Sequence, residues 1–424
     1  MTFARPLEPW RRTLYVIWLA QFIAMVGMSL VVPFLPFYIR DLGVTREEDV
    51  ALWSGIVFSG PFLFSFFLTP IWGYLGDRYG RKLMVVRAIF GLAISQALIG
   101  FSQSVEMLLF FRMLQGAISG FIASALALVS ATTPSEKSGY AISILQAAIA
   151  SGNVVGPLLG GTLADAMGYR PVFFIVAGFC TVAGILVVTL VHEERQPSPR
   201  GAARTSLVGN FRYAYRSRSI RHALMTIFLA QMGVLMLQPI FALYVEMLEP
   251  NEAYLATIAG AVFAVPGLFM VIGSPWWGQR NDKKSYKKNL TLALSGTAAA
   301  YIAQGFCTDV FQLIPFRALQ GFCMAGMLPA LFSYVSKNTA LIRRGGVMGI
   351  ASSFQVLANM IGPTGGGLVA AGLGLRETCF IAGGVLLVTV VYLRVFFVDL
   401  LGAGPAGEPP QPGLPREALS GTGS

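Results

Sequence analysis

Apolar stretches close to twenty residues long, with few or no charged side chains, recur along this 424-residue chain from one end to the other. Each stretch is long enough to cross the roughly 30 Å hydrocarbon layer of a bilayer. A water-facing surface needs about a quarter of its residues charged, whereas only 12% of this chain is charged and 55% is hydrophobic. Because backbone groups in lipid find no water to pair with, the stretches must be helices. We therefore expect an all-α polytopic membrane protein.

The pattern predicts twelve spans, two of which are shortened at a charged residue. Arg87 and Arg394 limit the third and the twelfth span, and since long basic side chains can snorkel, both helices are free to run further. No cleavable signal peptide is expected, because the first apolar run is long and lacks a small-residue cleavage site. The predicted spans are residues 13–36, 50–71, 88–104, 107–130, 139–162, 171–191, 222–245, 254–276, 289–306, 311–335, 346–369 and 378–393.

The sequence offers little that would support catalysis. Its four cysteines, Cys180, Cys307, Cys323 and Cys379, lie in or beside spans without metal-ligand spacing. They are expected to be small core residues and not a disulfide framework. There is also no nucleophile–base pair and no phosphate-binding loop, so neither an enzyme nor a cofactor is expected.

The net charge of +11 is unevenly distributed along the chain. If the N-terminus is cytoplasmic, the inner segments carry 25 Lys or Arg and 9 acids, whereas the outer loops carry 4 basic residues and 11 acids. This asymmetry is the positive-inside rule, and it places both termini in the cytoplasm. The basic excess is therefore interpreted as a topology signal and not as a nucleic-acid-binding surface.

The chain also repeats itself at an offset of 205 or 206 residues. Matches in five spans predict two six-helix halves with a substrate site between them, because internal duplication is typical of secondary transporters. The predicted units are an N-terminal bundle (1–191), a basic cytoplasmic linker (192–220), a C-terminal bundle (221–397) and a disordered cytoplasmic tail (398–424). Matching pairs include Pro61 with Pro266, Trp72 with Trp277, Arg112 with Arg317, and Pro157 with Pro363.

Three short motifs carry a family resemblance. They are "GYLGDRYGRK" after span two, "RMLQG" in span four and "GNVVGPLLGG" in span five. Together with "WSGIVFSGPFLFS" and "VVPFLPFYIRDLG", they make the chain resemble the twelve-span drug:proton antiporter branch of the major facilitator superfamily over nearly its whole length. The resemblance implies a monomeric multidrug exporter of the bacterial inner membrane. Its partners would be a small-molecule substrate, protons and the lipid bilayer.

The first motif concentrates scarce charge in a tight turn. Its glycines permit close backbone approach and a sharp reversal, and Asp77 is placed to cap a helix N-terminus. The resemblance implies that Asp77 ties the two halves together on the cytoplasmic side and that Arg81 pairs with Glu136. The simpler alternative is that the basic residues are only topology anchors. The candidate latch comprises Gly73, Asp77, Arg78, Gly80, Arg81 and Glu136.

The span-five motif places small residues four apart on one helix face, so a neighbouring helix can approach closely. Pro157 removes a backbone donor and bends the span. Tight packing alone would explain the pattern, while the resemblance adds a helix that rocks during alternating access. The motif residues are Gly152, Gly156, Pro157, Gly160 and Gly161.

Arg112 and Arg317 are the two charges placed inside the predicted spans. Charge within a membrane is functional by default, because inserting it costs at least ~2.5 kcal/mol. For Arg112 the resemblance implies a buried role in coupling or substrate contact. For Arg317 two interpretations stay open, snorkelling to the outer interface or facing the interior.

No Asp or Glu lies within a predicted span, which leaves the proton carrier unassigned. It also predicts a neutral to positive cavity that prefers neutral or anionic amphipaths to permanent cations. The proton could be carried by the latch acids Asp77 and Glu136, by a change around Arg112, or by acids at the outer mouth. The mouth acids are Asp41, Glu106, Asp165, Glu246 and Glu377.

Amides and thioethers in the spans are the remaining candidates for a substrate cavity. A membrane amide serves equally well as interhelical glue worth about 0.6 kcal/mol, and methionines supply an adaptable apolar lining or plain packing. A proton-coupled uptake symporter for a sugar or organic anion is the alternative function, although it would need a denser set of polar ligands. The candidates are Gln21, Met25, Met28, Gln146, Asn153, Gln231, Gln238, Gln355 and Asn359.

Overall fold

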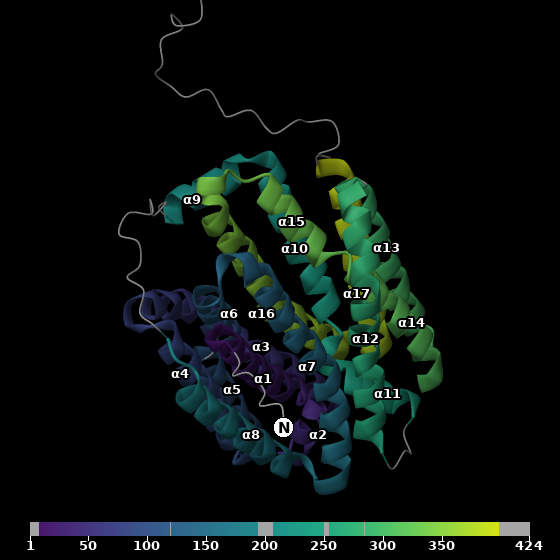
Figure 1. Cartoon of the computed structure of the whole chain (residues 1–424). Coiled ribbons are helices and arrows are strands. Elements are labelled where there is room, and N and C mark those ends of the chain that lie inside the picture. Colours follow the sequence, from purple (N-terminus) through teal and green to yellow (C-terminus); the bar gives the residue numbers. More distant parts are fainter. Residues whose placement is uncertain (1–7, 119, 194–206, 250–253, 284, 398–424) are drawn as a thin grey trace, which may run out of the picture.

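The computed structural model describes residues 8–118, 120–193, 207–249, 254–283 and 285–397, and these residues form helices and their connections. The predicted tail and residues 194–206 of the predicted linker lie outside these ranges. Figure 1 shows the helices as two bundles, the first coloured purple to blue-teal and the second teal-green to yellow.

The first bundle consists of α1 (Pro9–Ser29), η1 (Val32–Phe34), α2 (Leu35–Asp41), α3 (Glu47–Tyr79), α4 (Arg81–Gly100), α5 (Val105–Ile118), α6 (Phe121–Thr132), η2 (Ser135–Lys137), α7 (Ser138–Met167) and α8 (Tyr169–Leu190). A linker helix, α9 (Leu207–Arg216), follows. The second bundle consists of α10 (Arg218–Leu235), η3 (Gln238–Ile240), α11 (Phe241–Leu248), α12 (Leu255–Lys283), α13 (Tyr286–Gly305), α14 (Val310–Met324), α15 (Leu328–Lys337), η4 (Leu341–Arg343), α16 (Arg344–Leu373) and α17 (Leu375–Phe396).

Within the described ranges, eleven helical stretches are long and apolar enough to cross a membrane. The remaining predicted span corresponds to α13, which packs against α14 and α17. This helix is more polar than the others, because it begins with two lysines and contains Asn289 and Gln304. Helix α4 begins before Arg87 and α17 ends after Arg394, so the third and twelfth spans do extend past their arginines.

Four spans that the sequence predicts as continuous helices are interrupted. Spans one and seven break at the short 3-10 segments that contain Pro33 and Pro239, since proline removes a backbone donor. Span four breaks at Gly120, whose φ of 110° lies in the region that only glycine adopts easily. Span ten breaks between α14 and α15, just before Pro329. The interruptions therefore occupy equivalent spans of the two halves.

Contacts within one half recur within the other, as expected for a duplicated chain. The Tyr38 hydroxyl donates to the Ile99 carbonyl at 2.9 Å, and Tyr244 repeats this bond to Gln304 at 2.6 Å. The indole N–H groups of Trp72 and Trp277 donate to Ala117 and Phe322 at 2.8 and 2.7 Å. Each half therefore carries its own matching set of internal bonds.

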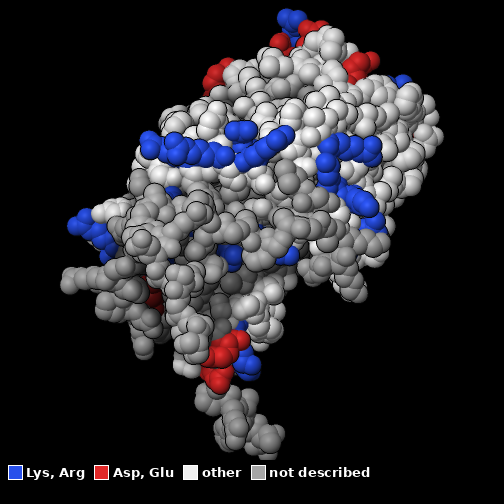
Figure 2. Space-filling view, turned by 90° about the horizontal axis from the view of Figure 1, so that it is seen from above, with Lys and Arg blue, Asp and Glu red and all other residues white. Residues whose placement is uncertain are grey.

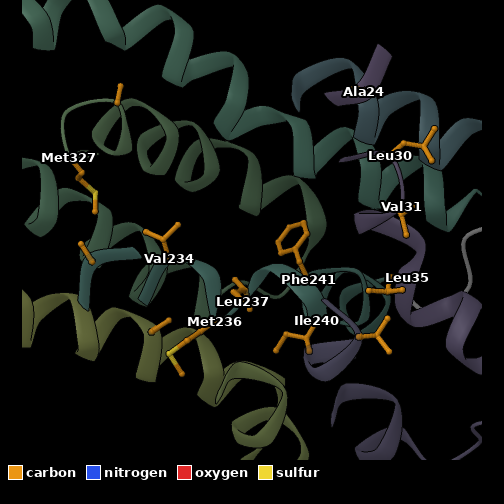
Figure 3. Packing of buried hydrophobic residues seen from close by; sticks show 14 of the residues in the cluster. Ala24, Leu30, Val31, Leu35, Val234, Met236, Leu237, Ile240, Phe241 and Met327 are labelled. Carbon is orange, nitrogen blue, oxygen red and sulfur yellow. The ribbon is translucent and has the colours of Figure 1, made fainter. Parts of the chain in front are cut away.

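Apolar side chains fill the space around the two bends. Figure 3 shows Leu30, Val31 and Leu35 from the bend of span one, together with Leu237 and Phe241 from the bend of span seven. These residues belong to one buried cluster that runs through both halves. The four cysteines are free and buried, as the sequence predicts, and Cys180, Cys307 and Cys379 belong to this cluster.

The two halves approach each other most closely at one end, which we call the far end; it bears α2 and α11. The opposite end, which bears α9, is the linker end. At the far end, a Cβ added to Gly55 would lie 2.5 Å from the Pro363 carbonyl oxygen of the other half. Near the linker end of α3, α7, α12 and α16, the Cβ positions of Gly73, Gly139, Gly278 and Gly349 have no neighbour within 4 Å. Those of Gly76 and Gly346 meet Met84 and Asn210, neither of which belongs to the opposite bundle. Close approach of these four helices is therefore confined to the far end.

Basic side chains gather at the linker end, which faces the viewer in Figure 2. Helix α9 lies in the predicted linker and was not expected as a helix. It packs on α10 and α16, and Arg343 donates to the Gly209 carbonyl at 3.2 Å. Its exposed side chains include Val208, Phe211 and Tyr215, alongside Arg212 and Arg216. Such a mixture suits the boundary between lipid and water.

Candidate functional site

A cavity of about 290 Å³ lies between the two halves, beside the bends of spans one and seven. Five of the sequence-predicted residues line it: Met25, Met28 and Asn153 from the first half, Gln238 and Arg317 from the second. Further lining comes from Phe58, Phe263, Met270, Gln320 and Met324. The surface is thus largely apolar, with four methionines and two phenylalanines beside five polar residues, which is the usual composition of a small-molecule site.

Two larger hollows, of about 420 and 720 Å³, are less suitable as a transport site. The first is lined by residues of α9, α10, α16 and α17, and the second by residues at the linker ends of α1, α6 and α8. Each belongs to one half, whereas an alternating-access site must contact both. We therefore take the central cavity as the candidate site.

Arg317 is buried at this cavity and does not snorkel, since only 4% of its surface is exposed. Its guanidinium lies 3.8 Å from the centre of the Phe241 ring, a cation–π contact. Its Nε donates to the Val262 carbonyl at 3.4 Å, and its Nη1 donates to the Gln320 amide oxygen at 3.3 Å. No carboxylate of the described residues forms an ion pair with it.

Arg112 occupies the equivalent position of the first half but does not line the cavity. It is also buried, at 6% exposure, and its Nη1 donates to the Gln115 amide oxygen at 2.9 Å. Its Nε has no hydrogen-bond partner in the described part of the chain. Arg317, and not Arg112, therefore lines the cavity in this conformation.

The other predicted amides lie away from the cavity lining. Gln231 donates to Asn359 at 3.1 Å and thereby joins α10 to α16 within the second half. Gln21 is buried in α1, Gln146 is exposed on α7, and Gln355 is half-buried on α16. The Gln231–Asn359 pair matches the interpretation of a membrane amide as interhelical glue.

Polar contacts across the halves reinforce the far end. The Asp165 carboxylate, at the end of α7, accepts hydrogen bonds from the Thr257 hydroxyl at 2.6 Å and the Thr257 backbone N–H at 2.7 Å. It thus caps the N-terminus of α12 in the other half, where the helix dipole favours an anion. Arg40 also pairs with Glu246 at 2.7 Å, and the Thr364 hydroxyl donates to Ser59 at 2.8 Å.

Removing the charge of Asp165 is expected to loosen this closure. Hydrogen bonds to a charged group contribute about 1.5–3 kcal/mol each, so Asp165→Asn should shift the equilibrium toward an open far end by roughly tenfold or more. Faster hydrogen–deuterium exchange in α2 and α11 would report the shift. Asp41→Asn is the matched control, because Asp41 pairs with Arg170 at 3.9 Å at an exposed site within one half. Equal exchange in both variants would contradict the assignment.

The latch motif lies at the linker end, where the bundles are apart. Gly80 ends α3 with a φ of 110° and permits the reversal into α4. The described residues do not form the Arg81–Glu136 ion pair that the resemblance implies: the Arg81 side chain donates to the Ala127 carbonyl at 3.0 Å. Arg78 is exposed and lies over the Tyr79 ring at 5.4 Å. The Asp77 side chain lies outside the described part of the structure. Gly73 makes no close approach here, because its surroundings are open at this end.

The span-five glycines lie against α1. Added Cβ atoms would be 2.5 Å from the Met25 Cβ at Gly152, 2.0 Å from the Ser29 hydroxyl at Gly156 and 2.0 Å from the Leu30 carbonyl oxygen at Gly160. Gly161 instead faces the other half, with its Cβ position 2.1 Å from the Ala256 carbonyl oxygen. Pro157 lies inside α7 between them. The motif therefore serves both packing within one half and contact between halves.

The sequence reasoning missed the aromatic lining residues and the methionines of the second half that line the cavity, and it missed two polar residues. Gln320 lies in the quoted "RALQG" repeat, three residues after Arg317, so its side chain was identifiable as a neighbour on the same helix face. Glu193 accepts hydrogen bonds from the Arg81 and Lys82 backbone N–H groups at 2.9 and 2.8 Å and caps α4. Its position in a charged linker gave no signal of that role.

Comparisons with known proteins agree with this architecture. The family model of the Major Facilitator Superfamily matches residues 17–303 and 251–420. A multidrug resistance protein MdtG of Proteus mirabilis is 34% identical over 389 residues, covering 92% of this chain and 96% of that protein.

Two solved structures share the fold. A bacterial homologue of the human lysosomal transporter Spinster has a TM-score of 0.76 at 14% identity, with 92% of this chain and 97% of that chain covered. A D-xylose–proton symporter has a TM-score of 0.75 at 15% identity, with 92% and 98% covered.

Proposed function

This chain belongs to the major facilitator superfamily, and from that premise we propose that it exports amphipathic small molecules in exchange for protons. It is a multi-pass membrane transporter and not an enzyme. The relative named as a multidrug resistance protein supports export of drug-like compounds. We further propose that the linker end faces the cytoplasm of a bacterial cell, in agreement with the basic side chains gathered there (Figure 2).

The observation that carries the proposal is the central cavity. It is contributed by both halves, and its largely apolar lining includes four methionines and two phenylalanines; flexible thioethers adapt to ligands of different shape. Its few amides are fewer than a sugar site would need. A binding surface of this kind favours varied amphipathic compounds over one polar nutrient.

Alternating access follows from the way in which the halves meet. Contacts across the far end, from Asp165, Arg40 and the glycines, hold that end closed. Near the linker end, Gly73, Gly139, Gly278 and Gly349 have no close neighbours. Rocking of one bundle against the other would break the far-end contacts and bring the linker ends together, where the Asp77 latch would engage.

The far-end acids are better suited to gating than to carrying protons. Asp165 accepts its bonds as a carboxylate while the far end is closed. A proton carrier must instead keep its proton as the far end closes, so that the proton is released on the inner side. Proton carriage therefore falls to a group other than Asp165.

Reconstituted vesicles with a pH gradient would test export and coupling together. A lipophilic dye should move against its gradient in exchange for protons, and a protonophore should stop its accumulation.

Asp77→Asn should fold normally and lower the transport rate at least tenfold, because the acid of the proposed latch loses its charge. Gradient-independent dye movement would contradict the coupling, and full activity of well-folded Asp77→Asn would contradict the latch.

A further inference from the structure

The arginine at the central cavity carries a charge that no described acidic side chain neutralises. No described carboxylate pairs with Arg317, and the residues that line the cavity include no Asp or Glu. A guanidinium has five N–H donors. Only two of its nitrogens, Nε and Nη1, donate hydrogen bonds in the described structure. The N–H groups of Nη2 are therefore available to donate hydrogen bonds to a ligand.

A polar network fixes the direction in which Arg317 is presented. The Gln320 amide oxygen accepts from Gln304 at 3.1 Å as well as from Arg317. The Gln320 amide nitrogen donates to the Tyr301 hydroxyl at 2.9 Å, and that hydroxyl donates to the Val234 carbonyl at 2.7 Å. Gln320 holds the guanidinium on one side, and the Phe241 ring lies 3.8 Å from it. The guanidinium therefore has little freedom to turn away from the cavity.

We propose that Arg317 is the head-group site for acidic amphipaths, with the carboxylate or sulfonate of the substrate against Arg317 and its apolar body among the cavity methionines. This inference rests on the proposed export function and names its substrate class. A guanidinium matches a planar carboxylate in two parallel hydrogen bonds. A permanent cation would meet this positive group without an acidic partner, and desolvation would exclude it.

Comparison of the two halves explains why Arg317 lies at the cavity and its counterpart Arg112 does not. Phe58 and Phe263 occupy equivalent positions and both line the cavity. At the bend, however, the position of Phe241 is taken by Leu35 in the first half. Arg112 therefore lacks the stacking ring and is bonded to Gln115 away from the cavity. The site is asymmetric although the fold is repeated.

Three fluorescent probes that share one apolar body separate the effect of charge from that of hydrophobicity. 1-Pyrenebutyrate, 1-pyrenebutanol and 1-pyrenebutyltrimethylammonium would be titrated against the purified protein and tested for efflux from cells. We expect the acid to bind at least tenfold more tightly than the ammonium compound. Arg317→Gln should weaken binding of the acid by about 10- to 100-fold, while the alcohol changes by less than about threefold.

Two further variants keep the test decisive if Arg317→Gln folds poorly. Gln320→Glu supplies an acidic partner beside Arg317 and should reverse the preference toward the ammonium probe. Arg112→Gln is the matched control, and it should leave the ratio of acid to ammonium affinity unchanged. Tightest binding of the ammonium probe to the unmodified protein, or equal loss of all three probes in Arg317→Gln, would overturn the inference. Failure of every probe to bind or be exported would instead contradict the proposed function.

Discussion

Gly161→Ala is expected to abolish transport while leaving the protein folded. The added methyl group would lie 2.1 Å from the Ala256 carbonyl oxygen, which belongs to the other half. That contact exists only when the far end is closed. A clash of this size costs about 3 kcal/mol, equivalent to a shift of roughly 100-fold in the equilibrium. The variant should therefore be held with its far end open.

The measurement combines transport in vesicles with hydrogen–deuterium exchange and thermal unfolding. Exchange should rise in α2, α11 and the first turn of α12, with a melting temperature close to that of the unmodified protein. Gly139→Ala is the control in the same helix, because nothing lies within 4 Å of its Cβ position. Normal transport by Gly161→Ala would show that the far end need not close this tightly.

Gly160→Ala adds the same methyl group one residue earlier, and it is expected to destabilise the folded protein. At Gly160 the added carbon would lie 2.0 Å from the Leu30 carbonyl oxygen, within the same half. The α1–α7 contact is present whichever end is open, so no conformation relieves the clash. We expect a loss of about 3 kcal/mol of stability, with low expression and no transport.

Thermal unfolding of the purified variants would check this contrast. Gly160→Ala should lower the melting temperature, whereas Gly161→Ala should not, although the two substitutions differ only by one position. Gly139→Ala should be neutral or slightly stabilising, since alanine favours a helix over glycine by about 1 kcal/mol. If Gly160→Ala melted at the same temperature as Gly139→Ala, the α1–α7 packing would be looser than the structure indicates.

The helices and the two-bundle arrangement could be predicted because their signals are contained in the sequence. A span is an apolar run of a certain length, and the duplication is visible as matched residues such as Trp72 and Trp277. The interruptions of spans one, four, seven and ten escaped, since a run can stay apolar through Pro33 or Gly120. Hydropathy indicates that a segment is in an apolar environment, but it does not show where the helix is interrupted.

The cavity was harder to predict, for a geometric reason. Gln238 and Gln231 are both amides near the middle of the same span, yet one lines the cavity and the other bonds to Asn359. Gln231 lies on α10, whereas Gln238 lies in the 3-10 segment that follows it. Which of them reaches the cavity therefore depends on where the helix breaks, and a continuous apolar run does not reveal that position. Arg112 and Arg317 likewise occupy equivalent positions of one motif. Only Arg317 lines the cavity, because the side chains around the two arginines differ.

The burial of all four cysteines in the described bundles has a practical consequence for thiol chemistry. A maleimide or spin label added to the unmodified chain should react slowly, so the natural sequence can itself serve as the background for introduced cysteines. Gly139 on α7 and Gly278 on α12 have open surroundings at the linker end. Labels at these two positions, one in each half, would report the separation of the bundles during each transport cycle.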